Sequence, residues 1–218
     1  MSLNLTGKGL TRIPDYVFKM KNLRKLNLQH NQLRGNFLER IGELKNLEVL
    51  YLNGNALSKL PDAIGKLKNL RELYLGDNRL RTLPQSIGRL KKLKYLDLYH
   101  NWLTSLPESI GQLTNLQILH LATNNLRRLP ESIGQLKNLT FLVASDNKLT
   151  KLPESIGQLG KLRELYVGAN DLKTLPESIG QLKRLKKLYI DRIKVPASLS
   201  NKVIINERYT KEQFMKIF

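Results

Sequence analysis

Leucines recur along this chain with one spacing, and that spacing is the strongest signal in the sequence. Segments close to the form LxxLxLxxNxL begin at Leu23, Leu47, Leu70, Leu93, Leu116, Leu139, Leu162 and Leu185. The first two starts are 24 residues apart, and the other six intervals are each 23 residues. Within LxLxx the leucines alternate with other residues, which is the period of a short strand with one buried face. The pattern therefore predicts a repeat protein in which each unit contributes one short strand.

One polar position is as regular as the leucines. The ninth residue of the unit is asparagine in seven consecutive units. An amide side chain at a turn can donate to carbonyl groups and accept from N–H groups of its own unit and the next unit, and buried polar groups need such partners. We therefore predict a structural asparagine ladder, made of Asn31, Asn55, Asn78, Asn101, Asn124, Asn147 and Asn170.

The segment after each strand predicts a return path on the other side of the core. The sequence LPESIGQL occurs almost verbatim at 106–113, 129–136, 152–159 and 175–182. Its proline fixes a turn, its glycine is expected to adopt a left-handed backbone, and its Ile and Leu close the core. Strands that follow one another in one direction must pair in parallel. The fold class is therefore an α/β solenoid, coiled right-handed, with a parallel β-sheet on the concave face and short helical or 3-10 turns on the convex face.

The full pattern LxxLxLxxNxLxxLPxxIGxLxx resembles the leucine-rich repeat family. It is most similar to the 23-residue intracellular and bacterial class, which includes plant Ras-group-related proteins and Ras-pathway scaffolds. The resemblance covers about residues 3–195. It implies a horseshoe-shaped binding scaffold, and it does not name the ligand.

The repeat boundaries also predict the organisation of the chain, as a single domain over 1–218. Residues 1–22 match an incomplete N-terminal repeat, 23–195 hold the repeats, and 196–218 are expected to form a C-terminal cap with a short strand at 202–206 and a helix at 210–218. No cap precedes the first unit, so its uncapped end would allow self-association. The one extra residue after Leu33 predicts a bulge at 35–38.

Composition narrows the classes of function. Lys and Arg number 37 against 18 Asp and Glu, and the formal net charge of +19 raises the expectation of a polyanionic partner. The absence of cysteine excludes disulfides, thiolate metal sites and cysteine nucleophiles. With no apolar leader and no stretch of about 18 apolar residues, the sequence favours a cytoplasmic protein without a transmembrane segment.

Catalytic, metal and cofactor chemistry find little support in the sequence. His30, His100 and His120 have no HxxxH or HExxH spacing, and no phosphate-binding loop is present. Asp97 and His120 fall on neighbouring strands, but strand geometry puts Ser145 roughly 8 Å away, too far for a nucleophile beside its base. We expect Asp97 and His120 to form an ordinary cross-strand ion pair, and we expect no enzyme, no metal and no cofactor.

The surplus positive charge lies away from the predicted strands. The variable strand positions carry eight basic and seven acidic residues, a balance of 8 − 7 = +1. A row of lysines instead precedes most units and forms what we call the lysine rim: Lys21, Lys45, Lys68, Lys91, Lys137 and Lys183. Such a row either keeps a repeat protein soluble or binds phosphates. The small charge balance of the strands argues against a specific nucleic-acid ligand on the sheet. A polyanion binder acting through basic rims is the alternative function.

Aromatic side chains, unlike the charge, concentrate on the predicted strands. The leucine motif does not require tyrosine there, so these residues are either good strand formers or a contact surface. We favour an interaction scaffold that binds a protein with a convex, partly acidic surface. The predicted contact residues are Tyr51, Tyr74, Tyr95, Asp97, Tyr99, Trp102, Ile118, His120, Phe141, Val143, Tyr166 and Tyr189.

Overall fold

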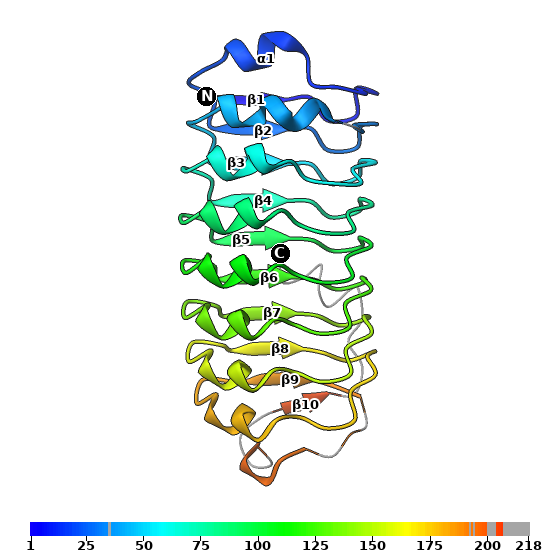
Figure 1. The fold of residues 1–218 in the computed structure, drawn as a ribbon, viewed down its shortest axis with the longest axis vertical. Coiled ribbons are helices and arrows are strands. Elements are labelled where there is room, and N and C mark those ends of the chain that lie inside the picture. The colour runs from blue at the N-terminus through cyan, green and yellow to red at the C-terminus, as the bar shows by residue number, and fades with distance from the viewer. Residues whose placement is uncertain (35, 192, 194, 200–203, 207–218) are drawn as a thin grey trace.

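One parallel β-sheet runs the length of the molecule, with one strand in each coil of a solenoid (Figure 1). The structure is a computed structural model that describes residues 1–34, 36–191, 193, 195–199 and 204–206. Its ten strands pair in sequence order and are three residues long. They are β1 Ser2–Asn4, β2 Lys25–Asn27, β3 Val49–Tyr51, β4 Glu72–Tyr74, β5 Tyr95–Asp97, β6 Ile118–His120, β7 Phe141–Val143, β8 Glu164–Tyr166, β9 Lys187–Tyr189 and β10 Ile204–Asn206.

Leucines fix the register of this sheet. The middle residue of each strand pairs with the middle residue of the next, from Leu3 with Leu26 to Leu188 with Ile205. From β2 to β9 these middle residues are leucines with no exposed surface. A shift of one residue would turn them to solvent, so the register is strongly determined. The first and third residues of each strand form two columns on the opposite, concave face of the sheet.

Short 3-10 helices cover the convex side of the core, as the LPxxIG segment predicts. A proline with φ between −66° and −75° precedes each of η2 to η7. In the first coil an α-helix, α1, takes the place of a 3-10 helix (Figure 1). The helices are α1 Asp15–Lys19, η1 Asn36–Glu43, η2 Asp62–Lys66, η3 Gln85–Arg89, η4 Glu108–Gln112, η5 Glu131–Gln135, η6 Glu154–Gln158, η7 Glu177–Gln181 and η8 Ala197–Leu199.

The glycine of each Ile-Gly pair allows two successive coils to pack closely against each other. A Cβ atom on Gly88 would lie 2.5 Å from the carbonyl oxygen of Ser109 in the next coil. The left-handed backbone expected at these glycines is wrong, because the glycines with positive φ among the described residues are Gly7, Gly9 and Gly54. The side chain is missing at Gly88 because successive coils approach each other there.

The unit that begins at Leu23, which has the one extra residue, contains a longer helix than the other units. Helix η1 has eight residues, whereas η2 to η7 each have five. The bulge predicted at 35–38 is therefore wrong for 36–38, which begin this helix, and residue 35 lies outside the described residues. The strands on either side keep their register, with Leu26 opposite Leu50.

The core is a continuous stack of apolar side chains, nearly all of them aliphatic, from Ile13 to Leu199. At one end Leu3, Leu5 and Leu10 are only partly buried against it, and β1 pairs with β2. At the other end β10 lies within the segment predicted as a strand, and the predicted helix at 210–218 lies outside the described residues. None of the helices in the described part is long and apolar enough to cross a membrane.

Candidate binding surface on the concave face

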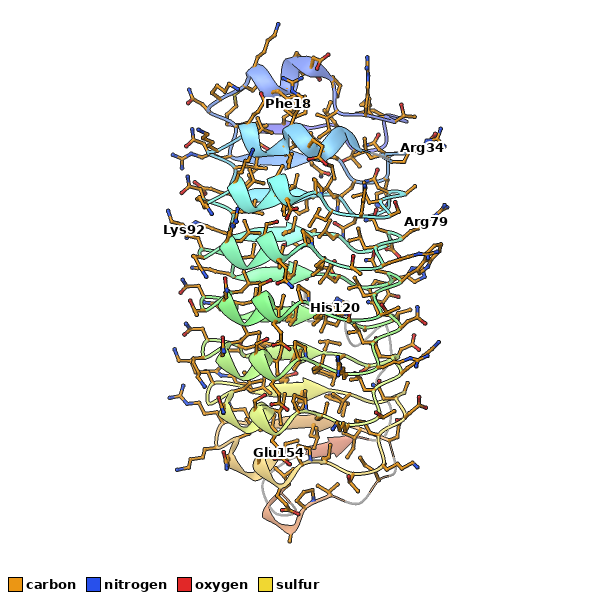
Figure 2. The ribbon with its side chains drawn as sticks, in the orientation of Figure 1. Phe18, Arg34, Arg79, Lys92, His120 and Glu154 are labelled. Carbon is orange, nitrogen blue, oxygen red and sulfur yellow. The ribbon has the colours of Figure 1, made fainter. Side chains whose placement is uncertain are left out.

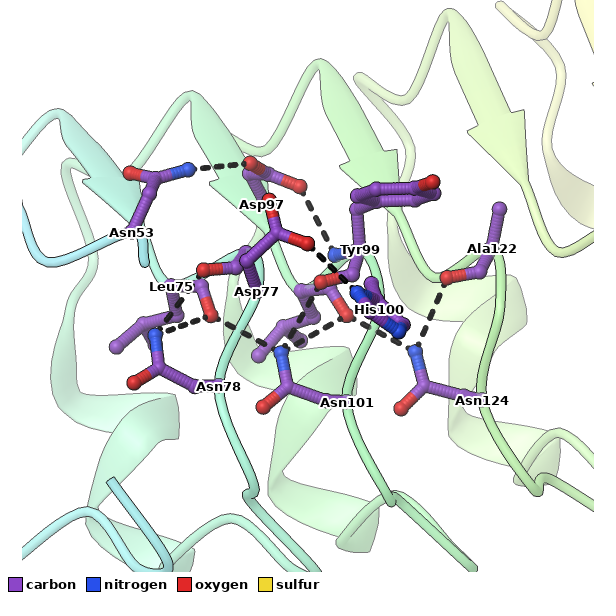
Figure 3. A network of polar contacts seen from close by, with 12 residues as sticks. Asn53, Leu75, Asp77, Asn78, Asp97, Tyr99, His100, Asn101, Ala122 and Asn124 are labelled. Atoms are coloured by element: carbon purple, nitrogen blue, oxygen red, sulfur yellow. Dashed lines mark hydrogen bonds and ion pairs between the residues drawn. The ribbon is translucent and has the colours of Figure 1, made fainter. Parts of the chain in front are cut away.

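The ladder asparagines tie each of their coils to its neighbours, and Figure 3 shows three of them, Asn78, Asn101 and Asn124. The Nδ2 atom of Asn101 donates to the carbonyl oxygens of Leu75 at 2.9 Å, Tyr99 at 3.2 Å and Leu98 at 3.3 Å. Its Oδ1 atom accepts from the backbone N–H of Leu80 at 2.9 Å. The other six make the same kinds of bond. The ladder holds the backbone of the concave face in place after each of the strands β2 to β8.

Three tyrosines stack in a row on the concave face, at β3, β4 and β5. The ring centroids of Tyr51 and Tyr74 are 4.6 Å apart with an interplanar angle of 18°, and those of Tyr74 and Tyr95 are 4.7 Å apart with the planes tilted by 33°. Burial, together with the nearby carboxylate of Glu72, raises the pKa of the Tyr74 phenol. We call these three residues the tyrosine stack. All three are half-buried, so part of each side chain is accessible.

Asp97 organises the middle of the concave face (Figure 3). Its carboxylate accepts from the Nδ2 atom of Asn53 at 3.1 Å and from the backbone N–H of Tyr99 at 2.9 Å. The Nδ1 atom of His120 lies 3.1 Å from the same carboxylate, at ion-pair distance, and the His120 ring stacks on Tyr99. The Ser145 hydroxyl is buried and makes no hydrogen bond within the described part of the chain. These residues therefore do not assemble a nucleophile–base pair there.

A second group of concave residues is buried. Val143, Tyr166, Tyr189 and Ala122 form a cluster separate from the leucine core, and Tyr99 and Phe141 pack against it. We call these six residues the concave cluster. Of the predicted contact residues, Asp97, His120, Val143, Tyr166 and Tyr189 are at least nine-tenths buried, whereas Ile118 on β6 is half-buried. The open apolar surface that we expected across all the central strands is thus limited to its half-buried members.

Trp102 lies outside both groups, in the loop after β5. Its side chain is 45% exposed, and the guanidinium groups of Arg79 and Arg81 lie 6.0 and 5.8 Å from its ring centroid. Figure 2 shows Arg34 and Arg79 at this edge of the solenoid and Lys92 at the opposite edge. The sequence analysis placed Trp102 in one contact surface with the tyrosines of the strands. The structure instead places Trp102 apart from them.

Part of the lysine rim is used to join coils. The Nζ atoms of Lys91 and Lys137 lie 3.1 and 3.4 Å from the backbone oxygens of Gln112 and Gln158, one coil further on. Lys21 forms an exposed ion pair with Glu43 at 3.5 Å. No group of three or more His, Asp or Glu side chains that could hold a metal ion occurs among the residues described.

Comparison with known proteins identifies the family. The model of a leucine-rich repeat region matches residues 1–96 and 85–149. The chain belongs to the leucine-rich repeat family. No curated protein matches it.

Solved leucine-rich repeat structures share the fold. A leucine-rich repeat protein of Leptospira interrogans is 39% identical, with a TM-score of 0.74 over 94% of this chain and 59% of that one. The ectodomain of the Arabidopsis thaliana receptor kinase GASSHO1/SCHENGEN3, solved in complex with Casparian strip integrity factor 2, is 32% identical, with a TM-score of 0.82 over 94% of this chain and 26% of that one. The leucine-rich repeat domain of the type III effector XopL is 27% identical, with a TM-score of 0.80 over 94% and 75%. The chain thus spans about three fifths of the Leptospira protein and a quarter of the receptor ectodomain.

The leucine-rich repeats also contain a second row of asparagines, which our sequence analysis missed. Asn46, Asn69, Asn115 and Asn138 each donate an exposed side-chain hydrogen bond to a backbone oxygen one coil back, at 2.8 to 3.1 Å. These residues directly precede the first leucine of a unit, so the same alignment could have found them. They support the backbone at the opposite end of each strand from the main ladder.

Proposed function

We propose that this leucine-rich repeat chain is a non-enzymatic interaction scaffold whose concave face binds a protein partner. The proposal rests on the tyrosine stack, which occupies strand positions that the leucine motif leaves free. Rigid aromatic side chains bring a large contact area with little conformational entropy to lose, and they are enriched in binding hot spots. The complex of the plant receptor ectodomain with Casparian strip integrity factor 2 supports the use of this fold to bind a partner.

The test is capture of a partner from the native host with the full chain as bait. The substitutions Tyr51→Ala and Tyr74→Ala remove two rings of the stack, and Lys91→Ala with Lys137→Ala is the matched control on the rim. Each lost ring should weaken binding of the captured partner by about 1–3 kcal/mol, or roughly 5- to 150-fold. If the tyrosine variant still binds the partner and the rim variant does not, the binding site lies on the lysine rim and the proposal is wrong.

The alternative function is polyanion binding by the basic rims. It is favoured by the net charge of +19, of which only +1 falls on the variable strand positions. A true polyanion site would show an affinity that falls log-linearly with salt concentration. We expect weak binding that is insensitive to nucleic-acid sequence.

We also propose a cytoplasmic location and self-association through β1. The location is supported by the absence of cysteine. Self-association is supported by the edge of β1 beside the half-buried Leu3 and Leu5, because unpaired strand edges can pair with another chain. Sedimentation of the wild-type chain and of Leu3→Lys would test this proposal: a monomer at all concentrations of the wild type contradicts it.

A further inference from the structure

A second basic row lies in the loops that follow the ladder asparagines. It consists of the residues at positions ten, twelve and thirteen of each unit, and we call it the arginine edge. In the seven units that begin from Leu23 to Leu162, these positions carry nine basic residues and one acidic residue, Asp171, a balance of 9 − 1 = +8. Figure 2 shows two members, Arg34 and Arg79, on the opposite edge of the solenoid from Lys92.

The cations of the arginine edge are exposed and unpaired. All nine basic residues are exposed, and none of them forms an ion pair within the part of the chain that the structure describes. Lys91 and Lys137 of the lysine rim, in contrast, bond to the next coil. A row of unpaired like charges destabilises the folded chain, and a bound anion would relieve the repulsion.

Trp102 occupies the one unit of these seven that has no basic residue at the three positions. Arginines lie in the coils on either side of it. Arg79 and Arg81 belong to the preceding coil, and Arg127 and Arg128 belong to the following coil. The row of charge is therefore interrupted near its middle by a single aromatic side chain with two cations on each side.

The indole ring of Trp102 has room for a ligand. The side chain is 45% exposed. The guanidinium groups of Arg79 and Arg81 lie 6.0 and 5.8 Å from the ring centroid, at the outer limit of a cation–π contact. A hollow of about 370 Å³ lies beside the ring and is lined by Arg81, Trp102, Thr104 and Asn125. An aromatic face, a guanidinium, a hydroxyl and an amide are groups that stack on a nucleobase or hydrogen-bond to it.

We propose that the arginine edge binds single-stranded nucleic acid, with a base stacked on Trp102 and phosphates held by the arginines on either side. Single-strand sites combine a cationic track with aromatic side chains, and this binding is insensitive to base sequence because every base has a π face. The two flanking coils are two coil spacings, or about 10 Å, apart. At ~3.4 Å or more per nucleotide, that distance holds no more than about three nucleotides. The inference rests on the alternative function, polyanion binding, and places it at one edge.

Other anionic ligands fit the arginine edge less well. The bases of a duplex are stacked inside the helix, out of reach of Trp102. A membrane surface would need a larger apolar area, whereas the leucines of these loops, such as Leu80 and Leu103, are buried. The carboxylates of an acidic peptide offer no π face to the ring. A row that only keeps the chain soluble gains nothing from an exposed indole.

Fluorescence of Trp102 provides a test in the full, unlabelled chain, because the sequence contains one tryptophan. The probe is a thymidine strand of about ten nucleotides, within the usual range of single-strand site sizes. It should quench the Trp102 emission, because a stacked base quenches indole fluorescence. An abasic strand of the same length has the same charge and no bases. It should bind at least about fivefold more weakly and leave the emission nearly unchanged.

Substitutions separate stacking from charge. Trp102→Ala should weaken binding of a labelled thymidine strand, measured by fluorescence anisotropy, by about 5- to 150-fold, and Trp102→Phe should restore part of the affinity. Arg81→Ala with Arg127→Ala should reduce the slope of log affinity against log salt by about 1.4. The matched control, Lys66→Ala with Arg89→Ala, removes the same charge at the ends of η2 and η3 and should leave the slope unchanged. All these side chains are exposed, so circular dichroism should show wild-type folding.

Several outcomes overturn the proposal. Equal affinity for the thymidine and abasic strands overturns it and leaves only the general polyanion binding of the alternative function. Unchanged affinity of Trp102→Ala, or an equal change of slope in the arginine variant and its control, also overturns it. Binding of phosphatidylserine vesicles or polyglutamate at the edge, without binding of the thymidine strand, assigns the edge to a membrane or an acidic protein instead. The test needs no protein partner, so failure of the concave-face proposal leaves these readouts intact.

Discussion

Replacement of Asn101 by leucine tests the ladder at its most buried rung. Asn101 is 2% exposed, and leucine has a similar size, so the substitution mainly removes hydrogen bonds. The backbone N–H of Leu80 would lose the acceptor that it has in the described structure. Two of the carbonyl oxygens that Asn101 contacts keep another hydrogen bond. The Leu75 oxygen still accepts from Asn78, and the Leu98 oxygen still accepts from Asn124.

The expected loss of stability follows from this count. An orphaned buried N–H costs about 1–3 kcal/mol, and loss of the 2.9 Å bond to the Leu75 oxygen adds about 0.5–1.5 kcal/mol. The two longer bonds, to Leu98 and Tyr99, contribute less. The free energy of unfolding should therefore fall by about 2–4 kcal/mol, and for a chain of this size the melting temperature should fall by roughly 5–15 °C.

The assay is thermal and guanidinium unfolding followed by far-UV circular dichroism, with Asn115→Ala as the control. Asn115 makes one exposed bond, to the backbone oxygen of Lys91 at 2.8 Å, so its loss should cost no more than about 1 kcal/mol. The reasoning fails if Asn101→Leu melts within a degree or so of the wild type. Equal losses in the two variants would also refute it, because burial would then not matter.

Further predictions concern packing, ionisation and charge. Gly88→Ala should destabilise by about 1–3 kcal/mol in guanidinium unfolding, because its Cβ meets the Ser109 backbone, whereas Gly160→Ala, with open space around it, should be close to neutral. Burial raises the pKa of Tyr51, Tyr74 and Tyr95, so the folded state holds these protons more tightly than the unfolded state. Their contribution to stability should be fully present below pH ~10 and be lost as the pH rises further. Unfolding curves measured between pH 8 and 11 should show this decline in the free energy of unfolding. The substitution Tyr74→Phe should make the decline smaller. Lys45→Ala with Lys68→Ala should reduce the slope of log affinity against log salt for a DNA duplex by about 2, and an unchanged slope would exclude these two lysines from the contact.

Much of the fold could be predicted because one sequence pattern repeats. The spacing of Leu73, Leu96 and Leu119 is enough to predict the strands, their register and their parallel pairing. These three properties depend only on contacts between one coil and the next. The positions of the ladder asparagines follow from the same alignment. The reason why position 88 requires glycine could not be predicted in this way, because it depends on how closely Ser109 in the next coil approaches.

The accessibility of the candidate site could not be predicted from the repeat. By pattern, Tyr74 and Tyr166 are equivalent, and both were expected on an open sheet. Their exposure differs, because Tyr74 is half-buried whereas Tyr166 is 1% exposed. A periodic pattern reports what each coil shares with the next, and it carries no information about how side-chain burial differs from one coil to another.

The long 3-10 helix η1 shows where this architecture tolerates changes in length. The unit with one additional residue has its longer helix between β2 and β3, and Leu26 still lies opposite Leu50. The same insertion within a strand would reverse the facing of every residue after it in that strand. Evolution or protein engineering can therefore lengthen, shorten or replace the convex turns, and add whole coils, while the concave face keeps its geometry and is free to diverge in sequence.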